Sequence, residues 1–219
     1  MKHAVRWSLG FVIACSLVAC SGQKVKGNGE ISSQARVTPE FSKIAIDGPF
    51  ILVVERKSPR NVIVTSDTNL QSYVKTMVED GKLEIYTQKD FRLQPTTPIM
   101  IQVATRDLAQ IEAKNGCSVT AADLNADAFE FDTKGDCQAT LSGKVDSAKF
   151  MVDGATRIDA KSLMSKQTQM DIKGSAQASV YATQKLDVKI KGAAQVTYYG
   201  KPPVINQAIF GSGELNKGA

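Results

Sequence analysis

The chain has 219 residues, of which 42% are hydrophobic and 22% charged, and its formal net charge is +5. This length suits one domain with an appendage. A small positive charge spread along the chain is not the footprint of a nucleic-acid-binding protein, so no nucleic-acid partner is expected. The only histidine, His3, and the only tryptophan, Trp7, lie in a segment that we expect to be removed. Their loss excludes histidine-based triads and histidine zinc sites.

The first residues have the pattern of a bacterial lipoprotein signal. A basic start precedes an apolar run over residues 9–19, which is too short to remain in a bilayer as a spanning helix. The run ends in Leu-Val-Ala-Cys20, which resembles the lipobox, where the cysteine is lipidated and becomes the mature N-terminus. We therefore predict a signal peptide over residues 1–19 and lipidation of Cys20. A plain signal peptide cleaved nearby is the alternative.

The residues after Cys20 predict where the protein is held. Ser21 in place of aspartate favours the outer membrane in enteric-type envelopes, so we expect an exported, lipid-anchored protein on either face of that membrane. Removal of residues 1–19 takes away two basic residues and no acid, which lowers the net charge to +3. Residues 20–38 are rich in glycine, serine and lysine and predict a flexible tether.

Residues 39–105 predict short strands with irregular spacing. Residues 50–54 are a continuous apolar run, as expected of a strand covered on both faces. The Asp80-Gly81 pair indicates a hairpin. Further strands are expected at 62–64 and 99–103, and one helical turn at 68–72. We expect this region to cap the N-terminal end of the repeats that follow, because a bare first rung would expose unpaired backbone groups.

Residues 106–215 form a repeat marked by a glycine every 18 to 20 residues. The glycines are Gly116, Gly135, Gly154, Gly174, Gly192 and Gly211. Apolar and polar residues alternate around each glycine, which indicates strands rather than helices. A fixed period of this size is typical of a solenoid, in which each unit buries its apolar face by stacking on its neighbours. We therefore predict an all-β fold, a β-solenoid with rungs of about 19 residues, and a short tail over residues 216–219.

Alignment of the rungs predicts which residues face inward. The positions two and four residues from each glycine are apolar or small, so we expect a narrow, filled interior without a ligand cavity. The first rung has one extra residue, so that Asn115 rather than Gly116 aligns with Gly135. Cys117 then lies on Cys137. Neighbouring strands are ~4.8 Å apart, which allows either a disulfide in an oxidising envelope or two buried free thiols.

Four segments in order carry a family resemblance. They are the opening F-S-K-I-A-I-D-G-P-F-I-L-V-V over residues 41–54, the segments at 62–70 and 79–85, and the glycine repeats through Gly213. Together they resemble the bacterial head-GIN domain, also called the putative auto-transporter adhesin head domain, over a domain of residues 39–215. The resemblance implies a single-stranded right-handed parallel β-helix on secreted or lipid-anchored envelope proteins, and the right hand agrees with the rule for parallel crossovers. It implies no established chemistry.

Outward positions of the repeat supply the candidate site residues. They are Asp132, Asp153, Asp171, Arg157, Gln138, Gln177, Gln195 and Tyr199. One interpretation is a solvated sheet face with opposite charges on neighbouring rungs. A second is a surface that hydrogen-bonds a glycan or an envelope protein. A third is a polysaccharide lyase or hydrolase that uses Arg157, the aspartates and a bound cation such as Ca²⁺.

We predict a non-enzymatic, lipid-anchored envelope module, without a metal or other cofactor, that binds a glycan or a protein partner. A structural or signalling envelope lipoprotein is a further alternative. The last strand, near residues 213–215, has no obvious cap. Its open edge predicts either an end-to-end homodimer or a frayed tail.

Overall fold

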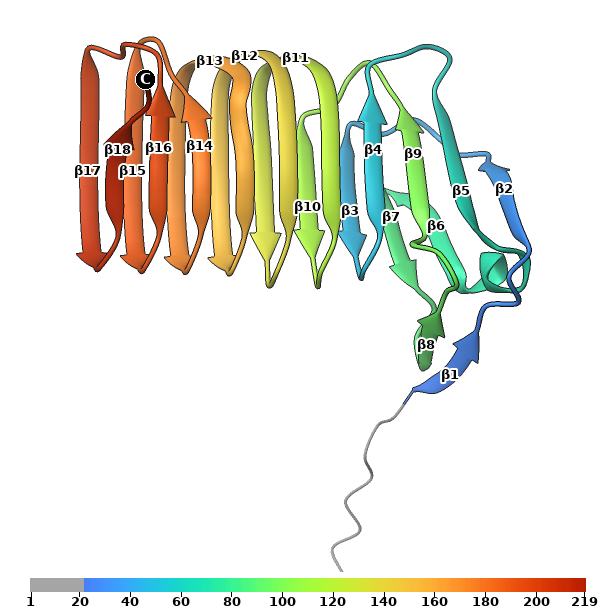
Figure 1. Cartoon of the computed structure of the whole chain (residues 1–219). Coiled ribbons are helices and arrows are strands. Elements are labelled where there is room, and N and C mark those ends of the chain that lie inside the picture. Colours follow the sequence, from blue (N-terminus) through green and yellow to red (C-terminus); the bar gives the residue numbers. More distant parts are fainter. Residues whose placement is uncertain (1–21) are drawn as a thin grey trace, which may run out of the picture.

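The computed structural model describes residues 22–219, which form an elongated stack of strands (Figure 1). The predicted signal peptide and Cys20 lie outside the described residues. The strands are β1 (Gln23–Lys26), β2 (Ile31–Arg36), β3 (Lys43–Asp47), β4 (Ile51–Glu55), β5 (Asn61–Asp67), β6 (Val74–Glu79), β7 (Lys82–Thr87), β8 (Phe91–Gln94), β9 (Met100–Ala104), β10 (Gln110–Lys114), β11 (Ser118–Lys134), β12 (Gln138–Gly154), β13 (Arg157–Gly174), β14 (Gln177–Tyr181), β15 (Lys185–Gly192), β16 (Gln195–Tyr199), β17 (Val204–Gly211) and β18 (Glu214–Lys217). A short 3₁₀ helix, η1 (Thr68–Tyr73), precedes β6. Within residues 22–219 no helix is long and apolar enough to cross a membrane.

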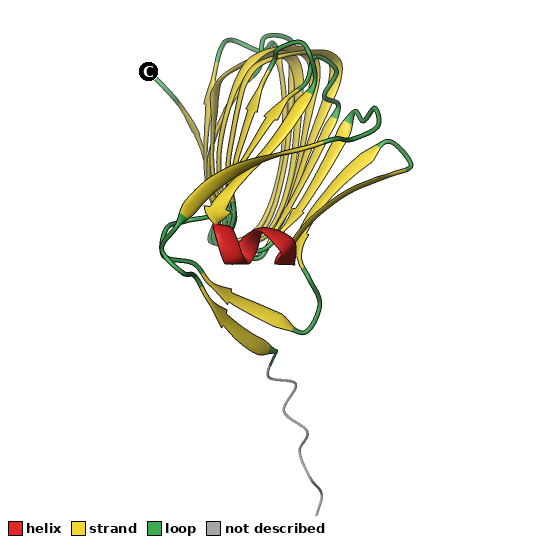
Figure 2. Ribbon diagram, turned by 90° about the vertical axis from the view of Figure 1, so that its right-hand side faces the viewer, coloured by secondary structure: helices red, strands yellow, loops and turns green. Residues whose placement is uncertain are grey.

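The stacked strands form a parallel β-solenoid of about five turns, which confirms the predicted fold class. In each coil the chain runs along one sheet, reverses at a glycine turn and returns along a second sheet (Figures 1 and 2). β11, β12 and β13 are long because each continues from one sheet into the other. The ladder of Phe131, Phe150, Met170 and Val188 is in register, as the alignment of the rungs predicted.

Side chains from the inward columns of both sheets fill the core. Phe131 and Phe150 are fully buried, and their rings meet edge to face with centroids 6.5 Å apart. The inward residues just after the glycine turns are small and buried, namely Cys137, Thr156, Ala176 and Ala194. Burial of these columns from water is the main force that holds the coils together, because a single coil has no second apolar surface to cover its own.

The N-terminal region first extends the solenoid and then closes its end. β3 pairs in parallel with β10, and β4 pairs with β11, so these two strands form one more coil. β7 and β9 add parallel strands beyond β3 and β4. β6, β5 and β2 then pair antiparallel on the outside and end the stack. The predicted cap, the hairpin at Asp80-Gly81 and the helical turn are therefore confirmed.

Residues 23–36 differ from the predicted flexible tether. β1 pairs with β8, and β2 pairs with β5, so this segment is part of the folded domain. The carboxylate of the buried Asp67 accepts hydrogen bonds from the backbone N–H of Gly29 at 2.8 Å and from the hydroxyl of Thr96 at 2.7 Å. The prediction failed here because it rested on side-chain composition. Edge strands offer backbone hydrogen bonds to a neighbouring segment whatever its side chains are.

Candidate functional site

The glycine turns divide the outward side chains between two opposite faces of the solenoid. The charged face comprises β10, β15, β17 and the halves of β11–β13 that precede a glycine, and the polar face comprises β14, β16, β18 and the halves that follow one. Arg157 follows Gly154 and lies on the polar face, whereas Asp132 and Asp171 lie on the charged face. The structure therefore does not form the cluster of Arg157 with the aspartates that the enzymatic interpretation required.

Ion pairs join strands of the sheet that carries the charged face. The Lys82 ammonium lies 2.6 Å from a carboxylate oxygen of Glu112, and Lys149 lies at the same distance from Glu130. The hydrogen bond to Glu112 raises the pKa of Lys82, which keeps this ammonium charged. These partly exposed pairs add little stability, but they satisfy the charges of these four residues without a ligand, as a solvated sheet face does.

The three predicted aspartates line one shallow groove around Met151. Asp132 accepts a hydrogen bond from the side chain of Gln110 at 2.9 Å, and burial raises the pKa of its carboxyl. Among the described residues, one buried oxygen of Asp132 and one of Asp171 have no hydrogen-bond partner. Lysines rather than Arg157 line the rest of the groove.

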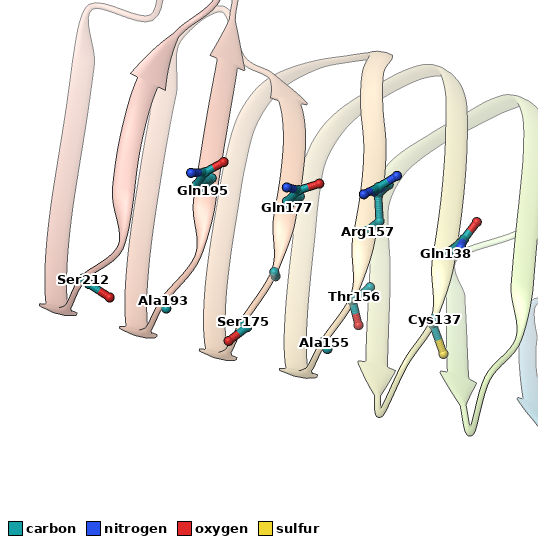
Figure 3. Close-up of a pocket in the computed structure, with 11 residues that line it drawn as sticks. Cys137, Gln138, Ala155, Thr156, Arg157, Ser175, Gln177, Ala193, Gln195 and Ser212 are labelled. Atoms are coloured by element: carbon teal, nitrogen blue, oxygen red, sulfur yellow. The ribbon is translucent and has the colours of Figure 1, made fainter.

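The polar face presents a row of four exposed side chains, one from each successive coil (Figure 3). The row consists of Gln138, Arg157, Gln177 and Gln195, which are partners in the strand ladder. Neighbours in the row are therefore ~4.8 Å apart. Within residues 22–219 none of these four side chains has a hydrogen-bond or ion-pair partner, so their donors and acceptors face solvent. They line one open groove along the turns.

Hydroxyl groups and two aromatic rings continue the polar face beyond this row. Ser179 and Thr197 follow the glutamines on β14 and β16, and Tyr181 and Tyr199 end these strands in register. Tyr199 was predicted as an outward aromatic, whereas Tyr181 was missed. Its outward parity with Gln177 was the signal that could have found it. The backbone of Gly218 packs against the Tyr199 ring, which leaves that ring only partly exposed.

The predicted stacking of Cys117 on Cys137 is confirmed. Both side chains are buried free thiols, and their Sγ atoms are 3.0 Å apart. The hydrogen bond to Cys137 and burial raise the pKa of the Cys117 thiol, which favours its protonated form. Disulfide formation stays a prediction.

The chemistry available on the polar face is hydrogen bonding and stacking. Its central acidic residue, Asp159, pairs with Lys161 at 3.4 Å, whereas glycoside hydrolysis uses two carboxyl groups on either side of the scissile bond. In the part of the chain that the structure describes, no three histidine, cysteine, aspartate or glutamate side chains gather to hold a metal ion. The fold and this face together define a parallel β-helix with one exposed hydrogen-bonding surface.

The comparison with known families agrees with this class. The model of the family described as "Putative auto-transporter adhesin, head GIN domain" matches residues 40–202, and the chain belongs to that family. This confirms the resemblance seen in the sequence. No curated protein matches the chain.

Solved structures share the fold. A "putative adhesin" from Bacteroides fragilis superposes with a TM-score of 0.71 at 16% identity, covering 88% of this chain and 99% of its own. A "putative lipid binding protein" from Parabacteroides distasonis gives 0.57 at 24% identity, with 90% and 100% covered. A "putative adhesin" from Parabacteroides merdae gives 0.52 at 18% identity, with the same coverage. At these identities the likeness concerns the fold alone.

Proposed function

We propose that this chain binds a glycan, without enzymatic activity, through its polar face. The observation that carries the proposal is the row of Gln138, Arg157, Gln177 and Gln195, whose side chains are exposed and have no partner within the described residues. Amide and guanidinium groups supply both donors and acceptors to sugar hydroxyls. On this face these groups are free for a ligand.

The spacing and composition of the face favour a chain-like ligand. A repeat of ~4.8 Å offers one polar group at each coil, which suits a polymer with hydroxyls at regular intervals. Tyr181 and Tyr199 supply apolar ring surface at one end of the face, where a sugar ring can stack. A protein partner is the competing ligand for the same surface.

We also propose that an N-terminal lipid on Cys20 attaches the module to the outer membrane. The support is the signal and lipobox pattern of residues 1–20, together with membership of a family of adhesin-like proteins. Metabolic labelling with a palmitate analogue tests this: Cys20→Ala should lose the label. Labelling that persists in this variant would contradict the proposal.

Binding of the purified chain without residues 1–20 to an array of bacterial and host polysaccharides tests the glycan proposal. We expect the double variant Arg157→Ala with Gln177→Ala to bind at least tenfold more weakly, because two hydrogen-bonding groups of ~1 kcal/mol each are lost. Lys189→Ala is the matched control, because it removes an exposed charge from the opposite face.

Three outcomes would overturn the proposal. Glycan binding that survives the double variant would place the site elsewhere. Failure to bind any glycan, combined with binding of a purified envelope protein that the double variant loses, would make the ligand a protein. Shortening of a bound polysaccharide over time would show an enzyme, and Asp132 and Asp171 would then be the first carboxylates to replace.

A further inference from the structure

The last strand of the charged face, β17, has no charged side chain, unlike the strands before it on that face. On β15 the outward residues are Lys185, Asp187, Lys189 and Lys191, whereas their partners on β17 are Val204, Asn206, Ala208 and Phe210. The last coil therefore loses every charge of its column. Val204 and Phe210 are 44% and 60% exposed.

The same strand leaves the end of the core uncovered. Within residues 22–219, β17 pairs only with β15, and β18 only with β16, so both have a free edge there. Ile205 continues the inward column of Leu186, which is fully buried, yet Ile205 is 41% exposed. Natural proteins protect such edges with charges, proline or a covering element, and β17 contains neither a charge nor a proline.

We infer that this end of the solenoid binds a second copy of the chain, edge to edge. The residue order of β17 is self-complementary about Gln207. Antiparallel pairing centred there places Val204 opposite Phe210 and Ile205 opposite Ile209, and Gln207 meets its own copy. Residues directly opposite one another point to the same side, so the inward residues of the two copies join into one core.

A single two-fold axis relates both sheets of one copy to the same sheets of the other copy. Gln207 lies four residues before the turn glycine Gly211, and Leu215 lies four residues after it, so the two residues stand at the same height on opposite sheets. An axis normal to the sheets through both pairs Leu215 with its own copy and Glu214 with Asn216. No like charges meet in this pairing, and a charged residue on the axis would face its own copy, so a neutral strand suits this contact.

A second copy is favoured over open-ended stacking because the two ends of the solenoid differ. At the other end the edge strands β2 and β6 pair antiparallel with their neighbours and carry the charged residues Arg36, Lys75 and Glu79, so the neutral edge of β17 has no matching edge there for a head-to-tail fibre. The two-fold axis places the polar faces of both copies on the same side. The dimer thus presents one continuous polar face of twice the length.

Sedimentation velocity of the purified chain without residues 1–20 tests the inference, with a dimer expected at micromolar concentration. Val204→Lys combined with Phe210→Lys puts lysine opposite lysine at both ends of the pair and should weaken the dimer roughly tenfold or more. Val204→Lys combined with Phe210→Glu puts opposite charges there and should restore it. Both substitutions are on exposed side chains, and circular dichroism checks that each variant folds.

A disulfide-crosslinking experiment tests where the two-fold axis lies. Gln207→Cys should give a disulfide-linked dimer under mild oxidation, because the two copies of this residue lie directly opposite each other. Lys189→Cys is the control and should not crosslink, because Lys189 lies on the outward side of β15, the strand that pairs with β17. A wild-type chain that sediments as a monomer, or a dimer equally stable in both double-charge variants, would overturn the inference.

Discussion

At the scale of single residues, the turn glycines are required by backbone conformation and by space together. Gly154 has φ +128°, and a Cβ atom there would lie 2.7 Å from the carbonyl oxygen of Gly135. The coils can approach this closely only without side chains. Asn115 takes the glycine position in the first repeat rung with φ +61°, and its side chain donates to Asp47 at 2.6 Å. Asparagine tolerates this left-handed conformation because its short side chain bonds locally.

Gly154→Ala should therefore lower the free energy of unfolding by about 2 kcal/mol or more, since it adds a steric clash to the cost of positive φ. Gly81→Ala is the matched control, because Gly81 has φ +70° but nothing within 4 Å of its added methyl group. Urea unfolding of both variants measures the difference. Equal losses would show that close approach of the coils does not contribute.

Asp67 makes the stability of the N-terminal cap depend on pH. Burial by itself raises the pKa of this carboxyl, but the hydrogen bonds from Thr96 and Gly29 outweigh it and hold the pKa below the ordinary 3.8. The carboxylate thus stabilises the fold above pH 3.8, and this contribution is lost as the pH falls through the lower folded value.

Asp67→Asn should lower the melting temperature at neutral pH, because an amide has one acceptor oxygen where the carboxylate uses two. It should also flatten the decline in melting temperature between pH 5 and pH 2. Thermal unfolding followed across this range measures both effects. A variant that declines as steeply as the parent chain would assign the acid sensitivity to other carboxyl groups.

At the scale of elements, the two ends of the solenoid differ in how their edge strands are covered. At the N-terminal end, β2 covers the edge of β5, and β1 covers β8. At the C-terminal end, β17 and β18 keep a free edge among the residues that the structure describes. A parallel stack gains stability from each added neighbour, so the covering strands contribute to the fold although their own side chains are mostly polar and exposed.

Removal of residues 22–36 should lower the melting temperature and increase aggregation, because the edges of β5 and β8 lose their partners. Light scattering during thermal unfolding records both changes. The parent chain lacking only residues 1–20 is the control. An unchanged melting temperature would show that this segment acts as the tether that the sequence suggested.

At the scale of the whole molecule, the solenoid separates two surfaces with different electrostatics. The charged face pairs some of its lysines with acids of the same sheet, while the polar face keeps its amides and its arginine free (Figure 3). A flat, nearly uncharged surface made from one residue per coil suits an extended ligand. β1 lies at the end of the domain opposite to β17 (Figure 1).

An adhesin-like module is expected to meet its ligand outside the cell. We therefore expect external protease to remove the domain from intact cells, with a periplasmic protein as the control for membrane integrity. A domain that survives until the outer membrane is opened would restrict the search for a ligand to the periplasm.

The sequence by itself determined the solenoid, its period and the direction of nearly every repeat side chain. Glycine spacing and strict alternation of apolar and polar residues are properties of the local sequence, and each stacked coil repeats them. The shift at Asn115 and the contact of Cys117 with Cys137 could be predicted for the same reason.

Only the tertiary structure decided on which face of the solenoid each row of outward side chains lies. Arg157 and Asp132 are close in a rung alignment, yet the turn at each glycine places them on opposite faces, since the chain reverses between two packed sheets. The tertiary structure also decided the order of the N-terminal strands and the pairing of residues 23–36 with the rest of the domain. Both follow from backbone hydrogen bonds between distant segments, and side-chain patterns do not specify such partners.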